Sequence, residues 1–204
     1  MPPARVVYIL RQVCAALREV HNQRLVHRDI KPDNIMLCRR GGEYDVAKVL
    51  DFGIVKNVDH PDTRDITQFV RILGAPLYMA PERLANPADV DARSDIYSVG
   101  AVAFYLLTGR APYISTPYTD LMHQIRYAAP PRPSAAATQA VPAELDELIY
   151  RCLAKSREQR PQQVAELVAV MDRLARDLPW TPVAAESWWR ERWPAYAAEK
   201  SAGD

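Results

Sequence analysis

The stretch from His27 to Asn34, with the sequence HRDIKPDN, constrains this chain more than any other. Pro32 prevents a regular helix from running through its middle, so these residues are expected to form a loop. The loop carries a carboxylate at Asp29, an ammonium group at Lys31 and an amide at Asn34. Three kinds of polar group held by fixed bends suit a reaction that depends on positioning and on neutralising charge.

The composition is that of an ordinary soluble globular protein. The chain has 204 residues, of which 49% are hydrophobic and 25% are charged, so it can bury a sizeable core in one domain or one large lobe. A net charge of +1 without a basic run argues against nucleic acid or a membrane surface as the partner. The longest apolar stretch, 99–107, is too short to cross a bilayer.

The cysteines and the N-terminus indicate a cytoplasmic protein. Cys14, Cys38 and Cys152 are scattered and lack metal-ligand spacing, so free thiols in a reducing compartment are expected. The sequence that begins at Met1 has no signal-peptide pattern.

The spacing of apolar residues predicts a mainly helical chain. An amphipathic helix is expected from Ala4 to about Asn22. A second helix, from Ser94 to Thr108, is apolar on every side in its second half and should therefore be a buried central helix. Gly109 is expected to end it. Further helices are predicted at 118–127, at about 142–153 and at about 162–175.

Two short apolar runs after the loop predict a β-hairpin. They cover 35–37 and 46–50, and Gly41 and Gly42 lie in the turn between them, at 39–43. The hairpin would bring Asn34, at its entrance, close to Asp51, at its exit. The long segment that follows, from 51 to 82, lacks periodicity, and a loop of that length is unusual in a compact domain unless it is functional.

The short motifs in this chain form an ordered set. They are HRDIKPDN at 27–34, DFG at 51–53, APE at 80–82, Asp95 with Gly100, and Arg160 followed by Pro161. Each motif alone is weak, whereas their order and spacing over about 5–175 are specific. The chain thereby resembles the C-terminal lobe of serine/threonine protein kinases of the bacterial, eukaryotic-like type.

The resemblance implies a mainly α fold, a helical bundle with a short β-hairpin. The kinase lobe would cover 1–177, with the catalytic loop at 27–34 and the activation segment at 51–82. A tryptophan-rich tail, 178–204, would follow. Its four tryptophans suit either a docking surface for a partner or a last segment that packs back onto the helical lobe, and we favour packing because tryptophan is strongly buried as a rule.

The same resemblance implies transfer of the ATP γ-phosphate to a Ser or Thr of a protein substrate. Asp29 would be the base that orients the substrate hydroxyl and accepts its proton. Lys31 would neutralise charge on the γ-phosphate. Asn34 and Asp51 would be the protein ligands of Mg²⁺, and Met36 would form the floor under adenine. A lysine two residues after the catalytic aspartate is the pattern of serine/threonine kinases.

Other positions match residues that shape the active site of the family. His27 and Phe52 would pack inside the assembled site, although a satisfied core histidine is the simpler interpretation of His27. Asp95 would accept hydrogen bonds from the backbone of the catalytic loop. Glu82 and Arg160 would form a buried ion pair at the end of the activation segment.

Arg28, beside the proposed base, marks the kinases that are switched on by phosphorylation of the activation segment. A phosphate there would bind Arg28 and Lys56 and order the segment. Thr67 is the first candidate acceptor and Thr63 the second. The competing interpretation is that both are solvated loop threonines.

The sequence departs from the family pattern in two places. Ala75 stands where such kinases usually have a threonine whose hydroxyl bridges the catalytic aspartate and lysine, a loss of about 1.5–3 kcal/mol that should reduce catalysis. The sequence also contains no G-x-G-x-x-G and no Val-Ala-Ile-Lys strand. The β-rich N-terminal lobe is thus expected to be absent and the chain alone inactive; the alternative function is a non-catalytic, kinase-like interaction module.

Overall fold

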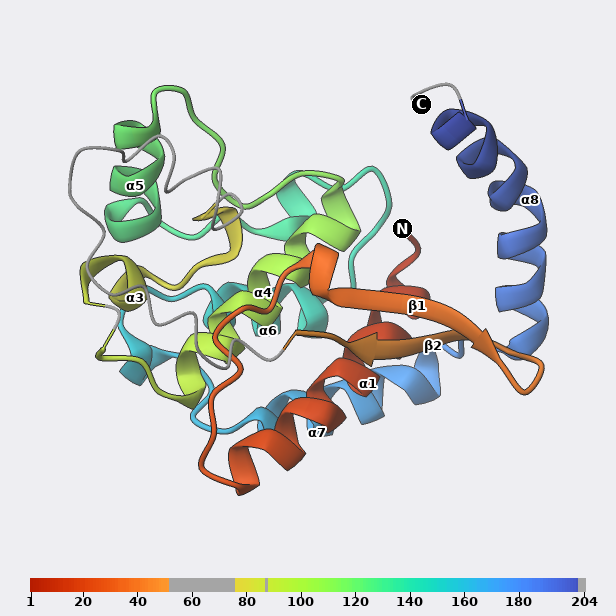
Figure 1. The fold of residues 1–204 in the computed structure, drawn as a ribbon, viewed down its shortest axis with the longest axis horizontal. Helices are drawn as coiled ribbons and strands as arrows, with labels where there is room; N and C mark the ends of the chain where they lie inside the picture. Colours follow the sequence, from red (N-terminus) through yellow and green to blue (C-terminus); the bar gives the residue numbers. More distant parts are fainter. Residues whose placement is uncertain (52–75, 87, 202–204) are drawn as a thin grey trace.

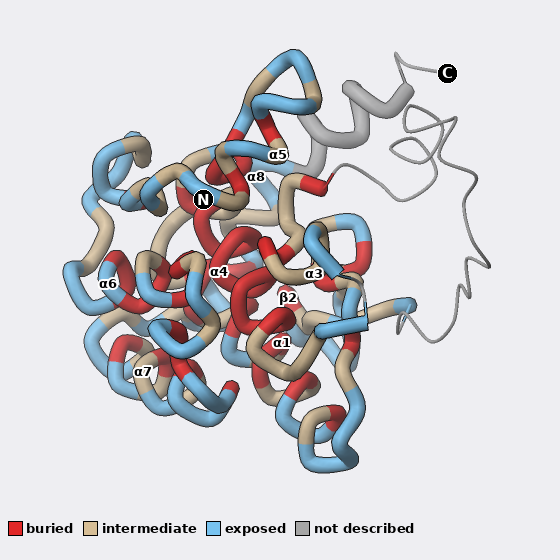
Figure 2. The backbone as a smooth tube through the Cα atoms, turned by 90° about the vertical axis from the view of Figure 1, so that its left-hand side faces the viewer, coloured by how far each residue is buried: buried red, intermediate tan, exposed pale blue. Residues whose placement is uncertain are grey.

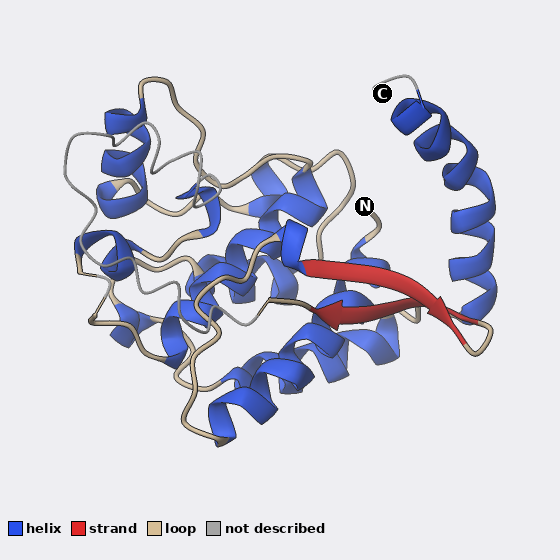
Figure 3. Cartoon of the chain, in the orientation of Figure 1, coloured by secondary structure: helices blue, strands red, loops and turns tan. Residues whose placement is uncertain are grey.

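The computed structural model describes residues 1–51, 76–86 and 88–201, with side chains described as far as residue 192. Within these ranges the chain is mainly helical, with one antiparallel sheet of two strands, β1 (Ile35–Arg40) and β2 (Glu43–Val49). The helices that precede the tail gather to the left of this hairpin and below it, and the C-terminal helix lies to its right (Figures 1 and 3). This confirms the predicted fold class, a helical bundle with a short β-hairpin.

Helix α4 (Ala92–Thr108) forms the centre of the core. The Asp91 carboxylate caps its N-terminus by accepting the backbone N–H of Arg93, and Gly109 ends it in the left-handed conformation with φ 77°. Every residue from Ser94 to Phe104 is buried (Figure 2), which explains why the second half of the helix is apolar all round. At Gly100 a Cβ atom would lie 2.5 Å from the Cβ of Cys152, so only glycine permits this close helix packing.

The other helices pack around α4. Helix α1 (Pro3–Asn22) lies along α7 (Val164–Asp177), and α4 contacts both α1 and α6 (Ala143–Cys152). A smaller hydrophobic cluster holds α5 (Tyr118–Tyr127) near α3 (Pro81–Ala85). Short 3-10 helices within the described ranges are η1 (Pro32–Asn34), η2 (Pro76–Tyr78), η3 (Pro133–Ala135) and η4 (Arg157–Gln159).

The hairpin lies against α1 and is longer than the sequence predicted. Arg39 and Arg40, expected in the turn, belong to β1, and the turn contains Gly41 and Gly42, with φ of 60° and 90°. Glycine adopts these values without steric cost. The pairing of Ile35 with Val49 fixes the register at the other end, which we call the open end of the hairpin.

The tail folds as helix α8 (Pro182–Ser201), and its main contacts are with β2. In Figure 1 it rises beyond the hairpin, away from the helical bundle. The tail therefore packs back onto the rest of the chain as expected, mainly against the hairpin and, through Arg5, against the start of α1. The tryptophans responsible are described below.

The three cysteines are free, as predicted. Burial raises the pKa of the Cys14 thiol far above its ordinary value and that of Cys152 to about 12, so both stay protonated. Within the described ranges, none of the helices combines the length and the apolar character that a membrane span requires.

Candidate active site

The loop after α1 is fixed by a buried carboxylate. Asp95, in the first turn of α4 and 1% exposed, accepts the backbone N–H of His27 at 2.8 Å through Oδ2. Its Oδ1 accepts the backbone N–H of Arg28 at 2.9 Å. Arg28 has φ 70°, a left-handed conformation that costs a non-glycine residue about 1–3 kcal/mol and persists only where its surroundings enforce it. Asp95 supplies that constraint.

His21 also contacts Asp95, and sequence reasoning missed it. Its Nε2 lies 2.9 Å from Asp95 Oδ2, so the imidazole is a third partner of this carboxylate. His21 is half-buried in the last turn of α1. Apolar periodicity gives no signal for such a position, because the contact depends on how α1 crosses α4.

Two side chains, those of Lys31 and Asn34, contact the same carboxylate oxygen of Asp29. Lys31 Nζ lies 2.9 Å from Asp29 Oδ2, and Asn34 Nδ2 donates to the same oxygen at 2.8 Å. Asn34 Nδ2 also donates to the backbone carbonyl of Asp29 at 2.7 Å. Both of these bonds use the nitrogen of the Asn34 amide, so its Oδ1 remains available to a metal ion. The carboxylate, the ammonium group and the amide thus form one compact polar group.

Asn34 and Asp51 flank the open end of the hairpin. The Leu50 backbone N–H donates to the Asn34 carbonyl at 2.8 Å, directly beyond the pairing of Ile35 with Val49. Asn34 is 6% exposed, whereas Asp51 is exposed and has φ 47°. An amide oxygen and a carboxylate are hard ligands of the kind that Mg²⁺ takes, together with phosphate and water oxygens.

The residues fit Mg²⁺ better than a metal held wholly by protein. No group of three His, Cys, Asp or Glu that suits a metal occurs among the residues that the structure describes. A site with few protein ligands is the usual arrangement for a magnesium ion that arrives with phosphates.

His27 is fully buried, and its Nδ1 accepts the backbone N–H of Asp29 at 3.3 Å. Burial lowers the pKa of the His27 imidazole, and the nearby charge of Asp95 only partly offsets this. A neutral ring keeps Nδ1 free to accept that hydrogen bond. The imidazole therefore supports the backbone of the loop from inside.

A pocket beside the loop is lined by Arg28, Asp29, Lys31, Tyr78 and Arg83, among others. The guanidinium of Arg83 donates to the backbone carbonyl of Arg28. Burial lowers the pKa of Arg83, while the charge of Asp29 opposes the shift. Arg83 was also missed by the sequence analysis, although it directly follows the APE motif at 80–82.

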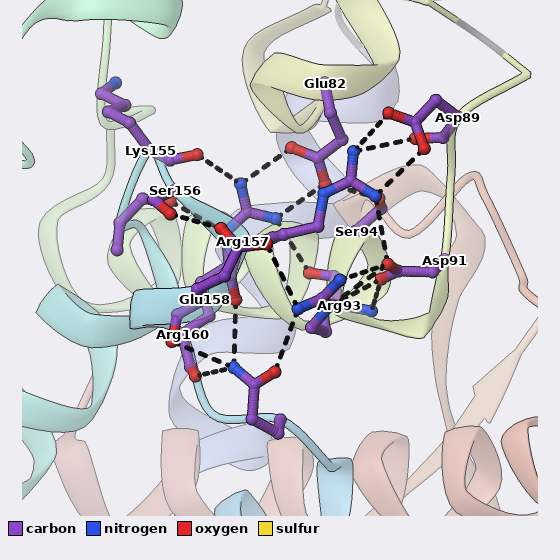
Figure 4. A network of polar contacts seen from close by, with 12 residues as sticks. Glu82, Asp89, Asp91, Arg93, Ser94, Lys155, Ser156, Arg157, Glu158 and Arg160 are labelled. Carbon is purple, nitrogen blue, oxygen red and sulfur yellow. Dashed lines mark hydrogen bonds and ion pairs between the residues drawn. The ribbon is translucent and has the colours of Figure 1, made fainter.

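Glu82 and Arg160 form a bidentate ion pair, with Glu82 Oε1 2.7 Å from Nη1 and Oε2 2.8 Å from Nη2 (Figure 4). Ser94 Oγ donates to Glu82 Oε1 at 2.6 Å. The Arg160 side chain is 0% exposed and also donates to backbone carbonyls, one of them that of Ala154 at 2.8 Å. Burial alone would raise the pKa of Glu82, but the charge and hydrogen bonds of Arg160, together with the bond from Ser94 and a backbone hydrogen bond, lower it.

The network in Figure 4 extends outward from this pair. Arg157 contacts Asp89 at 2.7 Å and Asp91 at 3.1 Å. Hydrogen bonds from the Arg93 side chain, more than any other contact, lower the pKa of Asp91 to about 2. These outer ion pairs are partly exposed and each contributes little to stability. Together they tie the start of α4 to the segment around η4.

Several residues that the sequence assigns to the site lie outside the described residues. Phe52, Lys56, Thr63, Thr67 and Ala75 all fall within 52–75, which the structure does not describe. Met36 is described: it lies on β1 and is 42% exposed. Its exposed side chain makes an apolar surface at this position.

The sequence is similar to known proteins over most of its length. A family model described as a protein kinase domain matches residues 1–170. Serine/threonine-protein kinase Pkn1 of Myxococcus xanthus is 44% identical over 162 residues, which are 78% of this chain and 22% of that protein. PknB of Mycobacterium leprae is 34% identical over 179 residues, 88% of this chain and 28% of that protein. Pkn3 of Myxococcus xanthus is 38% identical over 172 residues, 81% of this chain and 31% of that protein.

This chain belongs to the protein kinase family. Its relatives are named as serine/threonine kinases of bacteria. The chain spans between about a fifth and a third of the length of the curated relatives it matches.

Proposed function

We propose that this chain forms the catalytic C-terminal lobe of a serine/threonine protein kinase, which transfers the ATP γ-phosphate to a Ser or Thr hydroxyl of a protein substrate. The observation that carries the proposal is the contact of Lys31 and Asn34 with one carboxylate, that of Asp29. A carboxylate held by two partners is positioned before substrate arrives, and positioning accounts for most of the catalysis in phosphoryl transfer.

In this mechanism Asp29 orients the substrate hydroxyl and accepts its proton as the phosphoryl group is transferred. Lys31 then moves its positive charge from Asp29 toward the γ-phosphate and neutralises the transferring group. The amide nitrogen of Asn34 keeps Asp29 in place. Asp95 holds the loop itself, through the backbone of His27 and Arg28.

The nucleotide side of the site uses the open end of the hairpin. Asn34 Oδ1 and the Asp51 carboxylate would hold Mg²⁺, which neutralises the phosphates when bound. Met36 would lie under adenine. These assignments rest on the position of the residues at one end of the hairpin and on the chemistry of their oxygens.

Regulation is proposed to act through the segment 51–82, where phosphorylated Thr67 or Thr63 would bind Arg28 and Lys56. The Arg28 side chain is exposed, which suits contact with an incoming phosphate. We place the boundary of the lobe at residue 177 and expect the protein to act in the cytoplasm.

The chain alone should transfer phosphate slowly at most. These 204 residues contain seven glycines, which form no G-x-G-x-x-G, and they contain no Val-Ala-Ile-Lys. Kinases need both the lysine–glutamate pair and the metal-binding aspartate for activity.

A chimera tests the proposal. The N-terminal lobe of an active serine/threonine kinase is fused before Met1, and transfer of labelled phosphate from ATP to a generic protein substrate is measured. The expected result is Mg²⁺-dependent labelling of Ser or Thr that is lost in the Asp29→Asn chimera. A folded chimera that binds ATP and labels substrate no faster than Asp29→Asn would contradict the catalytic role and favour a non-catalytic module.

A further inference from the structure

A buried ion pair outside the catalytic loop joins α1 to the hairpin. Arg5, in the first turn of α1, is 1% exposed, and Asp45, on β2, is 0% exposed. Arg5 donates from Nε to Asp45 Oδ2 at 2.9 Å and from Nη2 to Oδ1 at 2.6 Å. The desolvation of two such charges is costly, and it is offset only when further partners satisfy them.

Tryptophans of the tail supply those partners. The indole N–H of Trp180 donates to Asp45 Oδ2 at 2.9 Å, and that of Trp189 donates to Oδ1 at 2.8 Å. The ring of Trp188 faces the Arg5 guanidinium, with its centroid 3.4 Å from Cζ, an arrangement that attracts a cation to an aromatic face. We call Arg5, Asp45, Trp180, Trp188 and Trp189 the tail cluster.

The tail cluster acts on the strand that leads to the proposed metal site. Asp45 has φ 58°, and its backbone carbonyl accepts the Gln12 side-chain N–H at 2.9 Å. From Asp45 the strand β2 runs directly to Val49, and the next residue, Leu50, bonds to Asn34 at the open end. An isolated hairpin of two strands is marginally stable in water, so its position depends on what anchors it.

The tail therefore contacts both strand β2 and the start of α1. The main contacts of α8 are with β2, and the family model ends at residue 170, before the tail begins. Arg5 and Asp45 thus lie within the residues that match the family model, and the three tryptophans of the tail cluster lie beyond them.

We propose that Trp180 and Trp189 are positioning residues of this kinase lobe. Their indole N–H groups fix the Asp45 carboxylate, and Asp45 in turn holds β2 so that Asn34 and Asp51 stay together at the open end. That Asn34 and Asp51 bind a metal rests on the proposed function. The mechanical coupling of the tail to the open end of the hairpin does not depend on catalysis.

Backbone hydrogen exchange on the whole chain, followed residue by residue by NMR, tests the coupling. The variant Trp180→Phe/Trp189→Phe keeps both aromatic rings and removes both N–H donors. Each lost bond is one to a charged group, so we expect the amide of Leu50 and the paired amides of β2 to exchange at least roughly tenfold faster. The amides of α4, which lie in the core, should exchange at the wild-type rate.

Trp188→Phe is the matched control. It keeps an aromatic face toward Arg5. In the described part of the chain the indole donors to Asp45 are Trp180 and Trp189, so exchange at Leu50 should change much less than in the double variant. The single variants Trp180→Phe and Trp189→Phe should each give part of the effect and guard against a double variant that folds poorly.

Two outcomes would overturn the inference. One is an unchanged exchange rate at Leu50 in the double variant. It would show that the tail packs on the hairpin without influencing its open end. The other is an equal acceleration in α4 and β2, which would show a general contribution to stability. Neither outcome bears on the proposed function, because the phosphotransfer by the chimera is measured independently.

Discussion

Two buried carboxylates, Asp95 and Asp45, hold different parts of this lobe in different ways. Asp95 accepts two backbone N–H groups of the catalytic loop and contacts His21. Asp45 is bonded through its carboxylate to side chains, those of Arg5, Trp180 and Trp189. A carboxylate that binds backbone N–H groups fixes local backbone angles, such as the left-handed φ of Arg28. One that binds side chains fixes where a whole strand lies.

The two carboxylates also differ in where their partners lie along the chain. Asp95 lies within the matched residues 1–170, as do all the groups that bind it. Asp45 lies there too, but two of its partners belong to the tail. Both carboxylates act on the same place, the catalytic loop and the open end of the hairpin that follows it. We call Asp95 the backbone anchor and Asp45 the side-chain anchor. The variants below test how far their contributions to stability differ.

The largest effect is expected at the side-chain anchor. Arg5→Met leaves the Asp45 carboxylate buried without its cation and should lower the free energy of unfolding by about 3–5 kcal/mol. Arg5→Met/Asp45→Leu replaces both charges with apolar groups and should be less destabilised than Arg5→Met. Urea denaturation measures both. If the double variant were the less stable one, the pair would contribute more than its desolvation costs, contrary to this account.

The backbone anchor should respond somewhat less to loss of its charge. Asp95→Asn keeps one acceptor oxygen and loses the other, which weakens hydrogen bonds to a charged group by about 2–3 kcal/mol in total. Asp172→Asn is the control, since its ion pair with Arg11 is exposed and should contribute less than about 1 kcal/mol. Chemical denaturation gives the free energy of unfolding of wild type, Asp95→Asn and Asp172→Asn. Equal stability of the two variants would mean that Asp95 does not constrain the loop.

A third variant, Glu82→Gln, tests a buried carboxylate that is bound to a side chain but is distant from the tail. The pKa of Glu82 is lowered from 4.5, so its ion pair stabilises the fold above that pH and this stability is lost as the pH falls through the folded-state pKa. We expect a difference of about 2 kcal/mol between wild type and Glu82→Gln at pH 7.

The pH dependence is the sharper part of that test. The difference should shrink as the pH falls below 4.5, where wild-type Glu82 becomes protonated as well. Glu186→Gln, in an exposed pair with Arg190, should match wild type at every pH. A constant difference between wild type and Glu82→Gln down to low pH would show that the charge of Glu82 is not what stabilises the pair.

The smallest effect is expected at His21, the side-chain partner of the backbone anchor. His21→Phe removes the ring nitrogen that bonds to Asp95 and should cost about 0.5–1.5 kcal/mol. His21→Gln retains a donor and should recover most of that loss. Thermal unfolding of the two variants suffices, and identical melting temperatures for Phe and Gln would exclude a hydrogen-bonding role.

The hairpin and five of the helices, α1, α4, α5, α6 and α7, were predictable, because periodicity and glycine positions determine them, whereas the helices α3 and α8 were not predicted. Gly109 ends α4 as expected, and α5 has the predicted bounds, Tyr118–Tyr127. The length of the hairpin was not predictable, since Arg39 and Arg40 look like turn residues until their pairing partners are known. The position of α8 was also out of reach, because tryptophans indicate burial without saying against what.

The candidate site was likewise predictable only in part. The order of the motifs gives the identity of Asp29, Lys31 and Asn34, but it does not give the direct contact of Lys31 with Asp29. Arg5 and Asp45 gave no signal, since a charged residue in an amphipathic helix or on a strand is usually solvent-exposed. Only the packing of three separate segments makes them a buried pair. Contacts between distant segments are what sequence patterns leave out.

The central claim is that both anchors bring Asn34 and Asp51 to one metal–phosphate site at the open end of the hairpin. The most direct test is NMR of this chain with ATP and Mn²⁺, a paramagnetic substitute for Mg²⁺. The account predicts broadening centred on the signals of Asn34 and Leu50, and its loss in Asp51→Asn while the α4 signals stay sharp. Broadening centred elsewhere, or unchanged in Asp51→Asn, would contradict it.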